Sequence, residues 1–269
     1  MLKKQLLKPA GILRPPPVMN LLREGRVVLD LLAMLGPLAR AAPVDTPLKS
    51  RHIMVLPGFG ADDTSTWPLR HYLSKLGQKT EGWGLGRNRA GADIRQTAAD
   101  FPKNWDIEAK DRYHGEAGVP LLCDKARERV LARHRILKKP ITLIGWSLGG
   151  YVAREVARDL PDVVSQVITL GSPVVGGPKY TSVAGLFRLR QMDLDWIESE
   201  SRKREKTPIT VPITAIVSPS DGVVGFEAAL DRLSPHVTHV ELDASHMGLG
   251  VNPRAWALVV QALARQDAA

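Results

Sequence analysis

A serine between two glycines, placed where a strand is expected to turn into a helix, constrains the fold of this chain more than any other feature. The apolar residues 141–144 predict a buried strand, and the apolar positions within residues 151–157 follow one face of a helix. The segment GWSLG, residues 145–149, joins the two, with Ser147 at its centre. The sequence therefore places a polar hydroxyl at a sharp corner of the core.

Strand-like and helix-like segments alternate from residue 51 onward, without internal repeats. Further strands are expected within residues 52–60, 79–91, 163–171, 209–219 and 237–242, and further helices within residues 67–77, 119–139 and 252–266. Residues 101–115 have no clear period, and no element is predicted there. Strands separated by helices indicate an α/β fold, with a mostly parallel central sheet covered by helices on both faces.

Composition is ordinary for a soluble globular protein, with 44% hydrophobic and 24% charged residues. A length of 269 residues is compatible with one large α/β domain. Cys123 is the only cysteine, which excludes an intramolecular disulfide and fits a reducing, cytoplasmic location. The sequence has neither an HExxH motif nor paired CxxC motifs, so we expect no metal and no cofactor.

The formal charge of +9 raises nucleic acid or an anionic membrane as a partner. Residues 1–50 hold eight Lys/Arg and three Asp/Glu, so +5 of that excess lies there. This segment has no aromatic residue to stack on bases and no nucleic-acid-binding motif follows it. The sequence therefore argues against nucleic acid as a partner.

Residues 1–50 form a segment separate from the domain expected over residues 51–269. Residues 1–17 are basic and rich in proline, and residues 18–43 resemble an apolar helix interrupted by Arg23, Glu24, Arg26 and Asp30. These charges exclude a membrane span of roughly 20 apolar residues. Three interpretations stay open: a helix packed on the domain, an interfacial helix in peripheral contact with a membrane, or a signal peptide cleaved near residues 39–41.

A strand, a Gly-x-Ser-x-Gly turn and a helix together form a nucleophile elbow. The serine needs a strained backbone to project its hydroxyl, and Gly145 and Gly149 remove side chains that would collide with neighbouring elements. The alternative is a tight turn with an incidental serine. The strand before Ser147 and the helix after it favour the elbow.

A serine hydroxyl needs a base to accept its proton and an acid to orient that base. In a strand–turn–helix fold the chain order is serine, acid, histidine. Asp221 follows an apolar strand, although it also suits turn formation, and His246 lies in the loop after residues 237–242. His236 and His239 lie at or within that strand, so we expect them to be solvated or packed. Asp243 is a rival acid, but it is too close in sequence to reach the ring of His246 easily.

The oxyanion of an acyl-transfer reaction needs two hydrogen-bond donors. The N–H of Leu148, directly after the serine, is one candidate. The other is expected in the loop after the first strand, where Gly58 permits a sharp turn and Phe59 can direct its N–H inward. The alternative role for Phe59 is that of an apolar plug.

Residues 51–265 resemble an α/β-hydrolase-fold serine hydrolase of the lipase/esterase kind. The resemblance lies in the motifs PGFG, GWSLGG, SPSDGVV and SHMGLG, and in LGSPVVGG, which is similar to a segment leading into a lipase lid. It implies Ser147 as nucleophile, Asp221 as acid and His246 as base, with Phe59 and Leu148 as oxyanion donors. Residues 1–50 lie outside the resemblance.

Residues 172–208 are longer than a plain crossover requires and predict a helical cap insertion. Six Lys/Arg and five Asp/Glu nearly cancel over residues 188–206, which suggests a solvated outer face. An apolar pocket beneath a cap favours a small-molecule carboxylic ester or lipid with a hydrophobic acyl group. A thioesterase, acyltransferase or cofactor-free haloperoxidase on the same triad is the alternative, and a non-catalytic binding module is a third interpretation.

Overall fold

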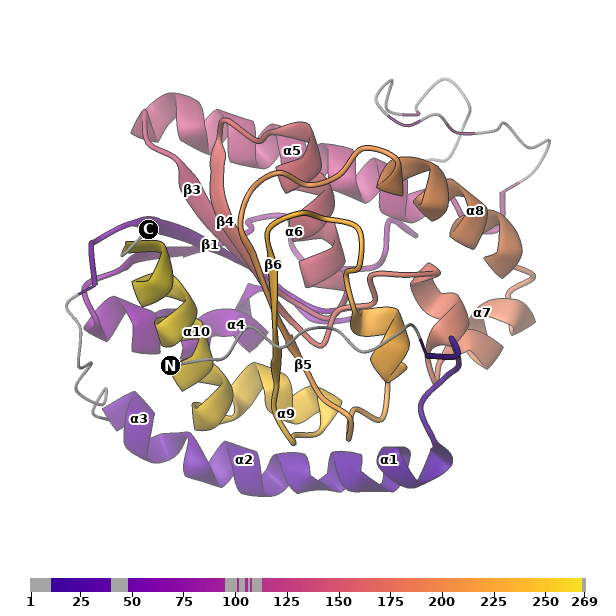
Figure 1. Cartoon of the computed structure of the whole chain (residues 1–269), viewed down its shortest axis with the longest axis horizontal. Coiled ribbons are helices and arrows are strands. Elements are labelled where there is room, and N and C mark those ends of the chain that lie inside the picture. Colours follow the sequence, from indigo (N-terminus) through magenta and orange to yellow (C-terminus); the bar gives the residue numbers. More distant parts are fainter. Residues whose placement is uncertain are drawn as a thin grey trace.

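The computed structural model describes residues 11–39, 48–94, 101, 105, 107 and 113–267. It contains a six-stranded sheet in which every neighbouring pair of strands is parallel (Figure 1). In spatial order the strands are β2 (Lys79–Gly82), β1 (His52–Leu56), β3 (Ile141–Trp146), β4 (Val164–Leu170), β5 (Ile213–Val217) and β6 (Val237–Glu241). The predicted mostly parallel α/β sheet is confirmed.

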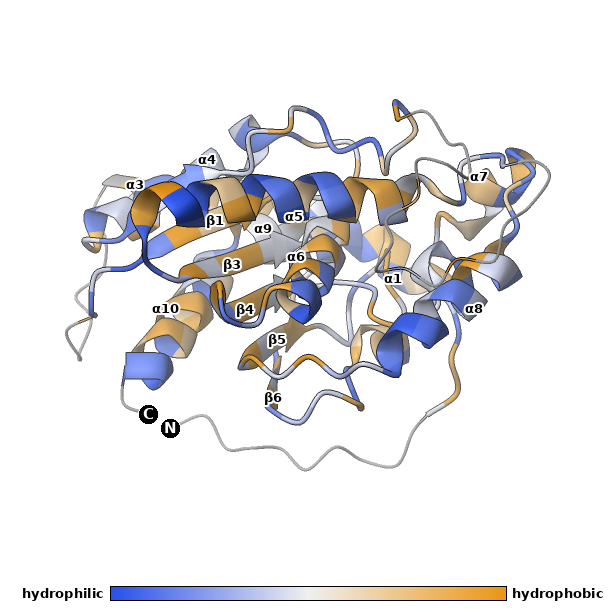
Figure 2. Ribbon diagram, turned by 90° about the horizontal axis from the view of Figure 1, so that it is seen from above, coloured by the Kyte–Doolittle hydropathy of each residue, from blue (hydrophilic) through white to orange (hydrophobic). Residues whose placement is uncertain are grey.

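Helices cover both faces of the sheet. Helices α5 (Gly118–Leu137) and α6 (Leu148–Asp159) pack on one face, and α4 (Asp63–Lys75) and α10 (Pro253–Asp267) pack on the other. Successive strand residues point to opposite faces, so Ile53 joins the cluster under α4 and α10 while Met54 joins the one under α5 and α6. Because both faces are buried, the central strands β3 and β4 are largely hydrophobic (Figure 2).

The chain between β4 and β5 contains η3 (Gly177–Tyr180), α7 (Ala184–Leu189) and α8 (Leu194–Glu205). The expectation that the charges of this segment form a solvated face is wrong in part. Arg204 on α8 is buried and pairs with Glu155 on α6, with Nε 3.0 Å from the carboxylate. It also contacts Asp159 at 2.7 Å. These ion pairs fix the hydrophilic helix α8 (Figure 2) to the sheet-covering layer.

The N-terminal helical segment comprises α1 (Val18–Arg23), η1 (Glu24–Arg26), α2 (Val27–Ala33) and α3 (Leu35–Ala39). It runs along the edge of the molecule beside α9 (His246–Val251), as Figure 1 shows. One more short element, η4 (Phe226–Ala229), follows β5. Within the described residues, no helix combines the length and the apolar character needed to cross a membrane.

Candidate active site

Ser147 occupies the turn between β3 and α6, with φ 53° and ψ −126°. A positive φ is uncommon for a residue with a side chain, and it projects the serine away from the strand direction. The Ser147 N–H donates to the carbonyl of Leu170 at 2.8 Å, which ties the turn to β4. The turn at Ser147 therefore has the strand before it, the strained backbone of positive φ and the helix after it that the sequence predicted.

The glycines around Ser147 are required by close backbone approaches. A Cβ on Gly145 would lie 2.3 Å from the Cα of Gly150. A Cβ on Gly149 would lie 2.4 Å from the carbonyl oxygen of Leu56, at the end of β1. Both distances are shorter than real Cβ contacts, so any larger residue would push α6 away from the sheet.

The structure brings Ser147, His246 and Asp221 together at the carboxyl edge of the sheet. The Nε2 atom of His246 lies 2.9 Å from the Ser147 Oγ. Its Nδ1 atom lies 2.8 Å from Oδ2 of Asp221. His246 and Asp221 are both 3% exposed. When Nδ1 carries the ring proton and donates it to the carboxylate, Nε2 is free to accept the hydroxyl proton of Ser147.

The carboxylate of Asp221 is oriented by its own turn. Its Oδ1 atom accepts hydrogen bonds from the N–H groups of Val223 at 2.8 Å and Val224 at 2.7 Å. Its second oxygen is thereby directed toward the ring of His246. The two interpretations of Asp221, as a turn residue and as a partner for His246, hold together in one geometry.

The rival acid and the other late histidines lie elsewhere. Asp243 is exposed and lies 3.6 Å from the guanidinium of Arg26. His239 is buried, and its Nε2 atom accepts from the N–H of Asp231 at 3.0 Å. His236 is exposed to solvent. The sequence analysis expected these two histidines to be solvated or packed, and the structure has His239 packed and His236 solvated.

The two candidate oxyanion donors flank Ser147. Leu148 is the first residue of α6, where helix N–H groups have no partner within the helix. Phe59 lies in the loop between β1 and α4 and is 43% exposed, and its ring centroid lies 6.0 Å from that of Phe187 on α7. Gly58 allows this loop to approach, since a Cβ there would lie 3.2 Å from the Cβ of Ser147.

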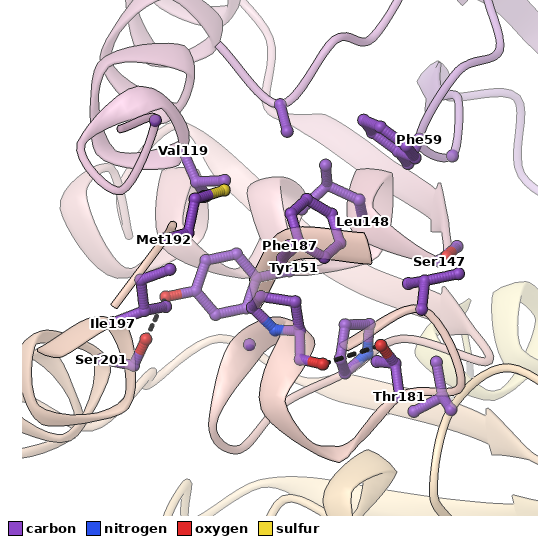
Figure 3. A pocket seen from close by; sticks show the side chains of 18 of the residues that line it. Phe59, Val119, Ser147, Leu148, Tyr151, Thr181, Phe187, Met192, Ile197 and Ser201 are labelled. Carbon is purple, nitrogen blue, oxygen red and sulfur yellow. Dashed lines mark hydrogen bonds between the residues drawn. The ribbon is translucent and has the colours of Figure 1, made fainter. Parts of the chain in front are cut away.

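A cavity of about 230 Å³ opens beside Ser147. Its walls come from α6, from η3, α7 and α8, and from the loop that carries Phe59, and they are mainly apolar (Figure 3). Hydrophobic side chains in this lining include Phe59, Val119, Leu148, Phe187, Met192 and Ile197. A polar pair lies deeper along the wall, where the hydroxyl of Tyr151 and Oγ of Ser201 are 3.3 Å apart (Figure 3).

Sequence reasoning missed Glu24, which contacts both loops of the site. Its Oε1 atom accepts from the N–H of Gly222 at 2.9 Å and from that of His246 at 2.7 Å. Its Oε2 atom accepts from the N–H of Met247 at 3.0 Å. A glutamate within an apolar helix was a signal, but its partners are about 200 residues away in the sequence.

Gly171 and Trp146 are two further site residues that sequence reasoning missed. Gly171 has φ +57°, and a Cβ there would lie 3.0 Å from Oδ2 of Asp221 and 3.2 Å from Nδ1 of His246. The indole N–H of Trp146 donates to the carbonyl of His246 at 3.1 Å. Both residues stand in segments that the resemblance covers, but only their spatial neighbours reveal these contacts.

No protein-family model matches the chain, and no curated protein matches its sequence. Solved structures do resemble it. A monoacylglycerol lipase of Paleococcus ferrophilus is 14% identical, with a TM-score of 0.53, over 81% of this chain and 97% of that one. A lipase of Bacillus licheniformis in its mature form is 11% identical, with a TM-score of 0.56, over 82% and 96%.

A third similar structure is a Butyrivibrio proteoclasticus protein, Est1E, solved with bound ferulic acid. It is 15% identical, with a TM-score of 0.52, over 83% of this chain and 90% of that one. At such identities the likeness concerns the fold. The parallel sheet, its covering helices and these structural matches show that this chain has the α/β-hydrolase fold of lipases and esterases.

Proposed function

We propose that this protein is a serine hydrolase that cleaves carboxylic esters with a hydrophobic acyl group through an acyl-enzyme intermediate. The observation that carries the proposal is the hydrogen-bonded chain from Ser147 through His246 to Asp221, with links of 2.9 and 2.8 Å. These are the distances over which a base can take a proton from a nucleophile and an acid can orient that base. The fold supports the same class of reaction.

In the proposed first step, Oγ of Ser147 attacks the ester carbonyl while Nε2 of His246 takes the hydroxyl proton. The carboxylate of Asp221 stabilises the imidazolium that forms and keeps its own negative charge. The oxyanion is stabilised by the N–H groups of Leu148 and Phe59, together with the positive end of the α6 dipole. His246 then donates its proton to the leaving alcohol, and the acyl group stays on Ser147.

In the second step, water attacks the acyl-enzyme. His246 takes a proton from that water, so the attacking oxygen becomes nucleophilic as it reaches the carbonyl carbon. The tetrahedral intermediate collapses, Ser147 regains its proton from His246, and the carboxylic acid leaves. Every group in both steps is a residue of this chain, the ester or water.

The apolar cavity wall supports a hydrophobic acyl group. In this proposal residues 172–208 act as a cap, because α7 and α8 contribute Phe187, Met192 and Ile197 to the cavity that adjoins Ser147. Burial of apolar area contributes about 25 cal/mol per Å². A longer acyl chain should therefore bind more tightly until it reaches the polar pair of Tyr151 and Ser201.

We also propose a reducing, cytoplasmic location, because the sequence has a single cysteine and so can form no intramolecular disulfide. The thiol of Cys123 is free and buried in the described structure. Burial raises its pKa well above the ordinary value. A protonated, buried thiol is chemically inert, which agrees with a role in packing alone.

The test is hydrolysis of p-nitrophenyl esters from acetate to palmitate by the wild type and by Ser147→Ala. We expect activity in the wild type with an optimum above acetate, and a loss of at least about 10³-fold in kcat in the variant. Parallel reactions with acyl thioesters, or with competing alcohols, distinguish an esterase from a thioesterase or an acyltransferase. Equal rates for the two proteins would exclude Ser147 as the nucleophile.

A further inference from the structure

The N-terminal helical segment is amphipathic, but its orientation is the reverse of the usual one. Over residues 18–32 its polar face packs on the protein and its apolar face points to solvent. Asn20, Glu24 and Asp30 are the inward polar residues. Asn20 donates to the carbonyls of Pro219 and Asp221, and Asp30 accepts from the side chain of Asn252 at 2.7 Å. A helix that only covers a core buries its apolar stripe instead.

The outward side of this segment is rich in apolar side chains. Its exposed large side chains are Val18, Met19, Leu21, Leu22, Val28, Leu29, Leu31, Leu32 and Leu35. Monomeric soluble proteins rarely expose a contiguous apolar patch larger than a few hundred Å², and larger ones mark contact with a protein or a membrane. We call these nine side chains the outer apolar face.

The charges beside the outer apolar face indicate which kind of partner binds there. Within residues 11–39 the exposed charged residues are Arg14, Arg23 and Arg26, and all three are basic. Because Arg26 lies 3.6 Å from the exposed Asp243, the positive excess at this margin comes from Arg14 and Arg23. The two acids, Glu24 and Asp30, are turned inward, where each accepts hydrogen bonds. An apolar face with basic residues at its margin suits the boundary between acyl chains and anionic headgroups.

The outer apolar face also adjoins the candidate active site. Met247 follows His246 on α9, its N–H donates to Glu24, and its side chain lines the cavity. The N-terminal helical segment therefore contacts a residue in the wall of the cavity. We propose that residues 18–35 dock the protein on an anionic lipid surface through the outer apolar face.

The experiment is sedimentation of the full chain with vesicles of phosphatidylcholine containing about one third phosphatidylglycerol. The test variant is Leu22→Gln with Leu32→Gln, two side chains that are 74% and 63% exposed. The matched control is Ile136→Gln with Leu233→Gln, which are 71% and 59% exposed on other surfaces. All four side chains face solvent, so both variants should keep the wild-type melting temperature.

We expect the test variant to lose at least about tenfold in vesicle affinity, because two leucines no longer enter the lipid. The control should bind like the wild type. Pure phosphatidylcholine vesicles, or high salt, should weaken binding by the wild type. Equal binding by all three proteins, or no vesicle binding by the wild type, would overturn the proposal. So would a dimer in light scattering that the test variant alone disrupts, since a second copy would then cover the face.

The hydrogen bonds of Glu24 carry a second inference, which rests on the proposed hydrolase activity. One carboxylate accepts from Gly222, next to Asp221, and from His246 and Met247. Glu24 thus joins the loop that carries Asp221, after β5, to the segment that carries His246, after β6. We infer that Glu24 is a positioning residue, which holds His246 and Asp221 at hydrogen-bond distance through their backbones.

Glu24→Ala and Glu24→Gln test this inference against Asp30→Asn, a change at the other inward acid of the same segment. We expect both Glu24 variants to lower kcat by about 10- to 100-fold with KM nearly unchanged, since small displacements at a catalytic pair are costly. The acidic limb of the pH–rate profile should shift, because the environment of His246 changes. Asp30→Asn should keep the wild-type kcat and profile.

Equal losses of kcat in the Glu24 and Asp30 variants would contradict a positioning role and show that Glu24 is only a structural contact. A lowered melting temperature with wild-type kcat and pH profile would show the same. If the wild type itself hydrolyses no ester, the proposed function fails instead. In that case, vesicle sedimentation still tests the lipid-docking proposal, because it measures binding and not turnover.

Discussion

At residue 147 the backbone holds a conformation that costs of order 1–3 kcal/mol for a residue with a side chain. Contacts with the neighbouring elements hold that conformation in place. The Ser147 N–H is bound by Leu170, and Gly145 and Gly149 let α6 start within contact of β1. The strain therefore belongs to the packing of three elements, and the hydroxyl is held against Nε2 of His246 as a consequence.

Asp221→Asn tests the orientation of His246 at this scale. The asparagine oxygen can still accept from Val223 and Val224, so the turn and the fold should survive. Its NH₂ group would then face Nδ1 of His246 and favour the tautomer in which Nε2 cannot accept a proton. We expect kcat for p-nitrophenyl esters to fall by about 10³- to 10⁴-fold.

The control for this substitution is Asp243→Asn, in the same loop as His246 but exposed and paired with Arg26. That variant should keep kcat within about twofold, since surface ion pairs contribute little. An unchanged kcat in Asp221→Asn would mean that another group orients the base.

At the scale of elements, α8 is held to the sheet layer by charge as well as by apolar contact. Arg204 on α8 meets Glu155 and Asp159 on α6, and Arg158 also pairs with Glu155 at 3.0 Å. Although burial alone would raise it, the adjoining guanidinium groups of Arg158 and Arg204 hold the pKa of Glu155 below its ordinary value. The wall of the cavity therefore depends on this cluster.

Arg204→Met should destabilise the protein by about 3 kcal/mol in urea unfolding, because it leaves the buried Glu155 and the half-buried Asp159 with one partner fewer. Arg202→Met, on the same helix, removes a surface pair with Glu198, in which the arginine side chain is 60% exposed. That change should cost less than about 1 kcal/mol. Similar losses in the two variants would show that the buried cluster does not secure α8.

At the scale of the whole molecule, regular features were predictable from the sequence and long-range ones were not. The strands and the elbow follow from local apolar runs and from the spacing of Gly145, Ser147 and Gly149. Helix α4 begins at Asp63, four residues before its expected start, because Asp62 caps it by accepting from the N–H of Thr64. The first turn of α4 is polar, so a prediction based on apolar spacing does not include it.

The orientation of the N-terminal helical segment also depends on long-range contacts that the sequence does not reveal. Its sequence identifies an apolar face, but not which face is buried. That choice depends on backbone N–H groups near residues 222, 246 and 247, which require an acceptor such as Glu24. The charges expected on the surface of α8 are turned inward for a similar reason, since their partners lie on α6.

Stability of the whole fold should depend on pH through His239. Burial lowers the pKa of His239, and its Nε2 atom accepts from the N–H of Asp231 in the unprotonated form. The unfolded chain takes up a proton at about pH 6.5, before the folded chain does. Protonation therefore favours unfolding, and stability should fall as the pH drops below about 6.5.

The urea midpoint should thus fall between pH 7.5 and pH 5.5 by more in the wild type than in His239→Gln, whose amide oxygen can also accept from Asp231. The exposed His236 provides the control, and His236→Gln should retain the wild-type pH dependence. If the urea midpoint falls equally in the wild type and in His239→Gln, groups other than His239 cause the pH dependence of stability.

Covalent labelling of the wild type with a fluorophosphonate, followed by peptide mapping, tests directly whether Ser147 is an activated nucleophile. A phosphonate forms a stable adduct only with a serine that a neighbouring base activates. We expect one adduct per chain, on Ser147, and none in Ser147→Ala or in His246→Ala. An adduct on another residue, or a wild-type chain that stays unlabelled, would contradict the assignment of Ser147 as an activated nucleophile.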